Sequence, residues 1–372
     1  MKVLHVSTDF PSKVDGKLHN YGGLGMCLFQ LVDGLTQRGA DLDILTRKDG
    51  DNCTEIIPGT IRVPYIKLTK SRNWKLTHGI TLIPRLLLSL VNNKYDILHA
   101  HNPPAAMCSI PIAKIFGIKT VMTMHGPWAG VRDRFRGLAK FIEDCCLLNA
   151  DIVTFDSHAL KNMYPQDKKY IAIQNAVDSD EFKPMDKSEC RSNLGLTKDR
   201  MILLYSGRAV YGKRLDTIFN VAKRCCDVDF IITGVNYDGR DGICPNIIYK
   251  KSIPNNEMPQ LYSACDGLIL ASDMEGMSRA VLEAMSCGIG VIVSDIKANR
   301  ETVGDISAGR FFKTDDELFE IVRDVTNEEL SDMGKKGRKL VLSNYSVKRR
   351  IDAFIDVYDS LTETKAIYSR IP

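Results

Sequence analysis

Short apolar runs alternate with longer amphipathic segments along the first half of the chain. The runs are apolar at consecutive positions, which is typical of parallel strands covered by helices on both faces. The longer segments repeat their apolar residues at helical spacing. We therefore predict strands at 2–7, 41–46, 60–68, 97–100, 120–124, 152–155 and 170–173, and helices at 24–38, 82–91, 105–116 and 135–148.

The second half of the chain repeats this order of elements after a polar stretch at 175–184. The repetition predicts an α/β protein with two doubly wound Rossmann-like domains, 1–178 and 179–344, that face a central cleft. The predicted strands of the second domain are 201–205, 229–233, 246–250, 267–271 and 290–294, and its helices are 215–225, 258–264, 279–287 and a helical tail from about Asp315.

The composition agrees with two cores in one chain. The chain has 372 residues, of which 44% are hydrophobic, and this length is too great for one ordinary core. The apolar stretch at 80–91 is interrupted by Arg85 and is too short to span a membrane, and no signal-peptide cleavage site precedes the first strand. Eleven cysteines without Cys-x-x-Cys spacing argue against a disulfide framework and a zinc site. We therefore expect a reducing, cytoplasmic location.

The net charge of +4 is unevenly distributed. Residues 1–185 carry 23 Lys and Arg against 18 Asp and Glu, whereas the remainder carries 27 against 28. This excess is too small for a nucleic-acid-binding domain, but it suits an anionic substrate or surface. A basic run enters a predicted helix in this half, and it is either a solvated face or a peripheral contact with anionic lipid or an anionic acceptor. The run consists of Arg132, Arg134, Arg136 and Lys140.

Two carboxylates flank the start of a predicted helix in the second domain. Glu275 lies in the loop after the strand at 267–271, and Glu283 lies about one turn inside the helix. The amides of Met277 and Ser278 open this helix, where N–H groups and the helix dipole favour an anion. The two carboxylates can grip hydroxyls on either side of a phosphate. The alternative is an ordinary acidic loop residue and a solvated helix residue, although the apolar neighbours of Glu283 predict a buried carboxylate with a partner.

A basic loop follows the first strand of the second domain. Gly207 and Gly212 allow a tight, irregular backbone. Arg208 and Lys213 put two cations at the carboxyl edge of the sheet. A diphosphate needs such cations, and a guanidinium matches phosphate geometry in particular. The alternative is a solvated basic loop.

Glycines and histidines mark loop positions of the first domain. Gly22 and Gly23 precede a helix and let the backbone approach a phosphate, but their spacing does not fit the dinucleotide fingerprint. His125 closes a predicted strand and faces the expected cleft. His99 and His101 end another strand, and because no third ligand has suitable spacing, we expect no metal site there.

Taken together, these motifs resemble the signature of the retaining GT-B-fold glycosyltransferases, in particular family 4. The pair Glu275-x7-Glu283 resembles the E-x7-E motif of that family, and the resemblance extends over about residues 1–360. As a set the signature is specific, whereas each piece alone is not. The other matching segments are Gly22-Gly23, His125-Gly126, 174–178 with Phe182 and Pro184, Gly207-Arg208 with Lys213, 261–266 and 271–288.

The resemblance implies a role for each residue. Arg208 and Lys213 bind the diphosphate of a nucleotide-sugar, Glu283 holds the ribose hydroxyls, and Glu275 approaches the hydroxyls of the donor sugar. His125 sits beside the sugar from the first domain. These cations take the place of a metal ion, so neither metal nor cofactor is implied. Backbone amides assist at Gly22, Gly23, Gly276, Met277 and Ser278.

The resemblance also implies the reaction. We expect a retaining hexosyltransferase that uses same-face attack, with GDP-mannose placed ahead of UDP-glucose as donor and a glycan, lipid or glycoprotein as acceptor. A last helix at about 345–372 is expected to cross back onto the first domain. The alternatives are a nucleotide-sugar epimerase of the same fold and a non-catalytic nucleotide- or glycan-binding module, while a dehydrogenase would need the missing fingerprint. The oligomeric state stays open, with a dimer among the options.

Overall fold

The chain divides into two compact units, each described here by itself. Unit 1 comprises Met1–Gln174 and Val347–Pro372, and unit 2 comprises Asn175–Ser346. None of the helices in the described ranges combines the length and apolar composition needed to cross a membrane. The computed structural model describes residues 1–14, 17–19, 22–48, 53–54, 57–63, 79–128, 136–210, 212–234, 244–251, 253–304 and 306–368.

Unit 1 is built on a parallel seven-stranded sheet with the order β10-β9-β8-β7-β1-β4-β6. The order places β1 between β4 and β7, so that His5 pairs with His99 across the strands. This register aligns polar residues from separate strands. The strands are β1 (Lys2–Val6), β4 (Asp41–Arg47), β6 (Thr60–Val63), β7 (Ile97–His101), β8 (Lys119–Met124), β9 (Ile152–Phe155) and β10 (Tyr170–Ala172).

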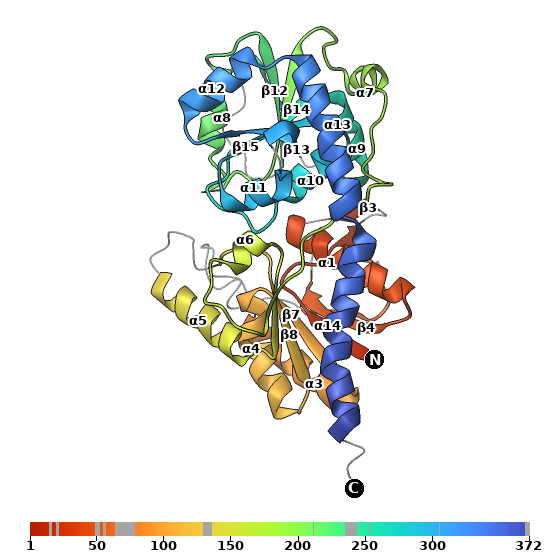
Figure 1. The fold of residues 1–372 in the computed structure, drawn as a ribbon. Helices are drawn as coiled ribbons and strands as arrows, with labels where there is room; N and C mark the ends of the chain where they lie inside the picture. Colours follow the sequence, from red (N-terminus) through yellow and green to blue (C-terminus); the bar gives the residue numbers. More distant parts are fainter. Residues whose placement is uncertain are drawn as a thin grey trace. The chain divides into compact units, whose positions relative to one another are not determined.

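Helices cover both faces of this sheet, because the strands are apolar on both sides. One face packs against α3 (Ile83–Asn92), α4 (Pro103–Ile115) and α5 (Arg136–Asn149). The other face packs against α1 (Gly23–Gln37) and α14 (Val347–Tyr368), which lie side by side (Figure 1). The C-terminal helix therefore completes the core of unit 1.

Unit 2 repeats the architecture with a parallel six-stranded sheet in the order β13-β12-β11-β14-β15-β16. The prediction of two doubly wound α/β domains is thus confirmed. The elements are β11 (Met201–Ser206), β12 (Val228–Gly234), β13 (Ile247–Lys251), β14 (Gly267–Leu270), β15 (Gly290–Ser294), β16 (Gly309–Phe312), α7 (Lys187–Leu194), α8 (Leu215–Ala222), α9 (Met258–Ala264), α10 (Arg279–Ser286), α11 (Lys297–Val303), α12 (Asp315–Asp324) and α13 (Asn327–Asn344).

The boundary between the units falls after Gln174, not after residue 178 as the sequence predicted. The N–H of Val177 donates to the carbonyl of Tyr345, and Val177 forms a bridge with Ser346. These backbone contacts tie the connecting segment to the end of α13. They also set the start of the returning helix α14, which begins at Val347 and not at residue 345.

Several short elements were not predicted, because they span too few residues for a periodic pattern. Among them are α6 (His158–Lys161), α7, α11, β16 and an antiparallel sheet of β2 (Ser12–Val14), β3 (Lys17–His19) and β5 (Cys53–Thr54).

Helix α13 lies directly against the end of α10 and the start of β15, and a glycine makes this approach possible. A Cβ atom at Gly334 would overlap the carbonyl oxygen of Gly288 and crowd Ile289. The overlap is with backbone, which cannot swing aside as a side chain does. In contrast, a Cβ at Gly137 in α5 would meet no atom within 4 Å.

The same substitution should therefore have opposite effects at the two glycines. We expect Gly334→Ala to lower the free energy of unfolding by about 1–3 kcal/mol through overpacking. Gly137→Ala should be neutral or raise it by about 0.5–1 kcal/mol, because alanine loses less backbone entropy in a helix. Urea unfolding of the intact chain measures both, and equal stability of the two variants would contradict the close packing of α13.

Candidate functional site

Two loops of unit 2 meet through an ion pair. Lys213, in the loop after β11, pairs with the carboxylate of Glu275, in the loop after β14. Because β11 and β14 are neighbours in a parallel sheet, both loops leave the same edge. The N–H of Asp273 also donates to the carbonyl of Gly212 at 2.8 Å. The structure therefore brings together two residues that were predicted from separate motifs.

Glu283 is buried and fully engaged. The Tyr262 hydroxyl donates to its Oε2 at 3.0 Å, and the Arg279 guanidinium donates to its Oε1 at 3.0 Å. The interpretation of Glu283 as a solvated helix residue is therefore wrong, because its apolar surroundings require a partner for the carboxylate. Sequence analysis did not single out Tyr262 or Arg279. Burial, followed by the charge of Glu283, raises the pKa of Tyr262 well above its usual range, so Tyr262 donates as a neutral phenol.

Helix α10 begins beside these carboxylates. Ser278 is its N-cap, but the serine side chain accepts no capping hydrogen bond from the first turn. The first turn of α10 thus has no side-chain cap, and a helix start of this kind favours an anion. The three amide donors predicted in unit 2, those of Gly276, Met277 and Ser278, are consecutive and lie directly before α10. Met277 is buried.

Arg208 is exposed directly after β11. Its guanidinium contacts no acceptor within the described part of the chain. Its charge therefore faces solvent, whereas that of Lys213 is already neutralised by Glu275. Before a phosphate binds, Lys213 is therefore part of an ion pair, whereas Arg208 is exposed to solvent.

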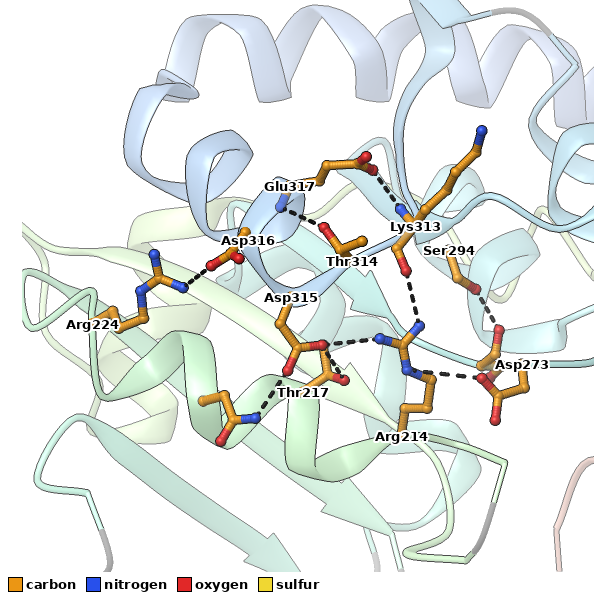
Figure 2. A network of polar contacts seen from close by, with 12 residues as sticks. Arg214, Thr217, Arg224, Asp273, Ser294, Lys313, Thr314, Asp315, Asp316 and Glu317 are labelled. Carbon is orange, nitrogen blue, oxygen red and sulfur yellow. Dashed lines mark hydrogen bonds and ion pairs between the residues drawn. The ribbon is translucent and has the colours of Figure 1, made fainter.

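A polar network behind the loops fixes the backbone next to Lys213 (Figure 2). Arg214 has a φ of 45°, which is rare for a residue with a side chain. Its guanidinium donates to Asp315 at 2.9 Å and lies 3.8 Å from Asp273. Asp315 also accepts from Thr217 and Asn220, at 2.8 and 2.9 Å.

The charge state of Asp315 keeps this network together. Burial alone raises its pKa, but the hydrogen bonds from Asn220 and Thr217 and the charge of Arg214 outweigh burial and hold the pKa below its usual range. Sequence analysis did not identify Asp315, because nothing in the spacing of residues 214 and 315 indicates that they meet.

In unit 1, both ring nitrogens of His125 bond to protein groups. Nδ1 lies 2.8 Å from Oδ2 of Asp156, and Nε2 lies 3.1 Å from Nδ1 of His101. The backbone N–H of His125 donates to Asn102, whose φ of 67° is itself unusual. Burial alone lowers the pKa of His125, but the charge and hydrogen bond of Asp156, together with Cys27, raise it to about 9.

The histidines of β7 have a third neighbour that the sequence did not reveal. His5 on β1 places its Nδ1 3.1 Å from Nε2 of His101. His99 bonds through both nitrogens to hydroxyl groups, of Tyr358 and Thr123, each at 2.6 Å. The nitrogens of the three histidines lie within 4.8 Å of one another, so the inference that His99 and His101 have no third neighbour of ligand type is wrong.

The remaining predicted residues lie at the start of two helices in unit 1. Gly22 has a φ of 128° and precedes α1, which begins at Gly23. A Cβ at Gly22 would meet open space, so a ligand can approach the backbone there. Of the basic run, Lys140 pairs with Asp144 on the surface of α5, whereas the side chains of its three arginines (Arg132, Arg134 and Arg136) lie outside the described structure.

Comparisons with known proteins agree with this geometry. Residues 21–181 match the family Glycosyltransferase Family 4, and residues 186–340 match Glycosyl transferases group 1. The chain is 25% identical over 355 residues to UDP-Gal:alpha-D-GlcNAc-diphosphoundecaprenol alpha-1,3-galactosyltransferase of Escherichia coli, with 87% of this chain and 90% of that protein covered. It is 22% identical over 373 residues to N-acetyl-alpha-D-glucosaminyl L-malate synthase of Bacillus anthracis, with 92% and 96% covered.

Solved structures share the fold. Sucrose-phosphate synthase from Thermosynechococcus elongatus aligns with a TM-score of 0.85 at 19% identity, over 98% of this chain and 100% of that one. Anabaena HepE in complex with UDP-glucose aligns with a TM-score of 0.77 at 17% identity, over 97% and 100%. The two parallel sheets, the motifs at their strand ends and these matches lead to one conclusion: the chain belongs to the GT-B-fold glycosyltransferases of the family 4 type.

Proposed function

We propose that unit 2 binds a nucleotide-diphosphate sugar and that the protein transfers its hexose with retention of configuration and without a metal ion. The observation that carries this proposal is the arrangement of Arg208, Lys213 and Glu275 with the start of α10. Two cations and an uncapped helix start lie at the edge of one sheet, and two carboxylates flank that helix start. This set is complementary to a diphosphate with a hydroxyl-bearing group on each side.

The charges suit the bond that breaks. Cleavage between sugar and phosphate leaves a diphosphate with added negative charge and a sugar with oxocarbenium character. Arg208, Lys213 and the amides of α10 stabilise the leaving group where that charge develops. When the diphosphate pairs with Lys213, the carboxylate of Glu275 loses its ion-pair partner and binds the hydroxyls of the sugar instead. We propose that Glu283, held by Tyr262 and Arg279, receives the ribose hydroxyls.

The comparisons support a change in the order in which donors are tested. The sequence placed GDP-mannose ahead of UDP-glucose. However, one similar protein is named as using UDP-Gal, and one similar structure contains UDP-glucose. We therefore propose a UDP-hexose as the first donor to test, and a lipid-linked or small polar acceptor. In same-face attack, the acceptor hydroxyl bonds to the anomeric carbon as the phosphate bond breaks, and its proton passes to a phosphate oxygen.

Two alternatives make different products from the same donor. An epimerase would return an isomerised nucleotide-sugar without an acceptor, and a binding module would return the donor unchanged. Formation of a new glycoside from donor and acceptor separates transfer from both. The intact set of charged residues at the sheet edge favours transfer.

The guanidinium of Arg208 should carry a large part of diphosphate affinity. We expect Arg208→Ala to weaken binding of UDP or GDP roughly 10- to 100-fold, because a charge-assisted hydrogen bond contributes about 1.5–3 kcal/mol. Isothermal titration calorimetry measures the dissociation constants. Arg224→Ala is the matched control, since Arg224 pairs with Asp316 on the surface of the same unit. Equal affinity of wild type and Arg208→Ala would contradict the proposal that the diphosphate binds at this site.

Unit 1 also carries a surface suited to a membrane. Helix α5 exposes Leu138, Phe141 and Leu148, with exposures of 51%, 65% and 76%. Their spacing of three and seven residues places them on one side of the helix. In the sequence, the basic run at 132–140 leads into this helix. We propose that α5 lies on an anionic lipid surface with its apolar side inserted.

A charge on this side of α5 should reduce membrane binding. We expect Phe141→Asp to bind vesicles of mixed phosphatidylglycerol and phosphatidylcholine at least several-fold more weakly than wild type in a sedimentation assay, because insertion of a carboxylate into the acyl boundary is unfavourable. Leu342→Asp, at a 52% exposed leucine of α13, is the control. Equal sedimentation of wild type and Phe141→Asp would show that α5 does not bind lipid.

A further inference from the structure

A chain of hydrogen bonds runs through the core of unit 1, from β1 and β7 to the residues that directly follow β8 and β9. Starting at β1, His5 contacts His101 at 3.1 Å, His101 contacts His125 at 3.1 Å, and His125 contacts Asp156 at 2.8 Å. The side chains are enclosed, with His5 and His101 fully buried and those of His125 and Asp156 only 7% and 3% exposed. No water-exposed group interrupts the chain.

Each contact in this chain needs one proton between its two atoms. Asp156 is an acceptor, so Nδ1 of His125 carries a proton. If His125 is neutral, the next two protons sit on Nδ1 of His101 and Nδ1 of His5. If His125 is doubly protonated, it donates from Nε2, and both His101 and His5 carry their protons on Nε2. The two states differ by one proton and by the tautomer of two buried imidazoles.

The groups around His125 decide between these states. Asp156 lies 2.8 Å from the ring of His125 and 3.9 Å from the guanidinium of Arg350, so the imidazole is its nearer partner. Arg350, from α14, donates instead to the carbonyl of Cys27 on α1. The Oδ1 atom of Asp156 accepts no hydrogen bond within the described residues. The ring of His125, the guanidinium of Arg350 and the thiol of Cys27 face this carboxylate, and the Cys27 Sγ lies within 4.8 Å of both the ring and the carboxylate.

The other histidines do not compete for the added proton. Burial lowers the pKa of His5 to about 3, and burial followed by the charges of neighbouring groups lowers the pKa of His99 and His101 well below the usual range. His99 stands outside the chain, with both nitrogens bonded to hydroxyl groups. Of the three histidines in the chain, only His125 has a raised pKa, at about 9.

We propose that this hydrogen-bonded chain holds His125 as a fixed imidazolium, so that unit 1 carries a positive charge and not a proton acceptor at the end of β8, with His101 and Asp156 as positioning residues. Both ring nitrogens then act as donors to protein groups, and neither is available to take a proton from an acceptor hydroxyl. A fixed cation stabilises negative charge that develops on a leaving diphosphate. Only the stabilisation of a leaving diphosphate rests on the proposed function. The protonation state of His125 does not depend on that function.

Histidine-selective ¹⁵N NMR of the full chain tests the proposal directly. We expect one imidazolium at pH 7.5 that titrates near pH 9, and two neutral imidazoles in the Nε2–H form. Asp156→Asn keeps an acceptor for Nδ1 but removes the charge, so the midpoint should fall below about 6.5, the ordinary value for histidine. Asp151→Asn is the matched control, because Asp151 bonds to Thr120 and not to the chain.

Several outcomes would overturn the proposal. His125 neutral at pH 7.5, His101 in the Nδ1–H form, an unchanged midpoint in Asp156→Asn, or a spectrum altered by a metal chelator would each do so. The wild-type spectrum alone decides the protonation state if Asp156→Asn fails to fold. In a sugar-transfer assay, Asp156→Asn should lose kcat at pH 8 and regain it toward pH 6. A protein without transferase activity but with the expected spectrum would refute the proposed function and leave the imidazolium intact.

Discussion

The ion pair of Lys213 and Glu275 is the interaction on which the candidate donor site depends. A parallel sheet brings the loops after neighbouring strands to one edge, but it does not fix their side chains. Opposite charges at partly buried positions do so, because each would otherwise be left desolvated without a partner. The pair also keeps the site electrically balanced before a ligand arrives. In the proposed site, an incoming diphosphate replaces Glu275 as the partner of Lys213, and Arg208 offers a second positive charge to it.

Two further sets of polar contacts restrain the residues around this pair. Arg214 keeps an unfavourable left-handed backbone next to Lys213, a conformation that persists only where surrounding contacts determine it. Asp315 provides these contacts from α12, far along the chain. On the other side, Tyr262 and Arg279 hold Glu283 so that both of its oxygens accept hydrogen bonds. Each of these carboxylates is thus restrained by residues of unit 2 itself.

The sequence predicted the regular elements and the strand ends, because periodicity and loop chemistry are local signals. It located Arg208, Lys213, Glu275 and Glu283 for the same reason. It did not find Tyr262 or Asp315, whose roles depend on which helices pack together. Nor did it find the third histidine, because His5 and His101 meet only through the strand order β7-β1, which residue spacing does not encode. The strand β16 was also missed, since Arg310 leaves it with only two consecutive apolar side chains.

The two units bury polar groups in different ways. Unit 2 pairs full charges at the edge of its sheet, where a ligand can replace one partner. Unit 1 buries neutral imidazoles on the face of its sheet, and the returning helix α14 closes over them with Tyr358 and Arg350. This polar layer is therefore complete only when the last helix of the chain has docked. Because unpaired polar groups in a core are unfavourable, the layer gives the sheet a strong preference for α14 over any other apolar helix. The buried histidines thus provide specificity for the C-terminal helix as well as a charge next to Asp156.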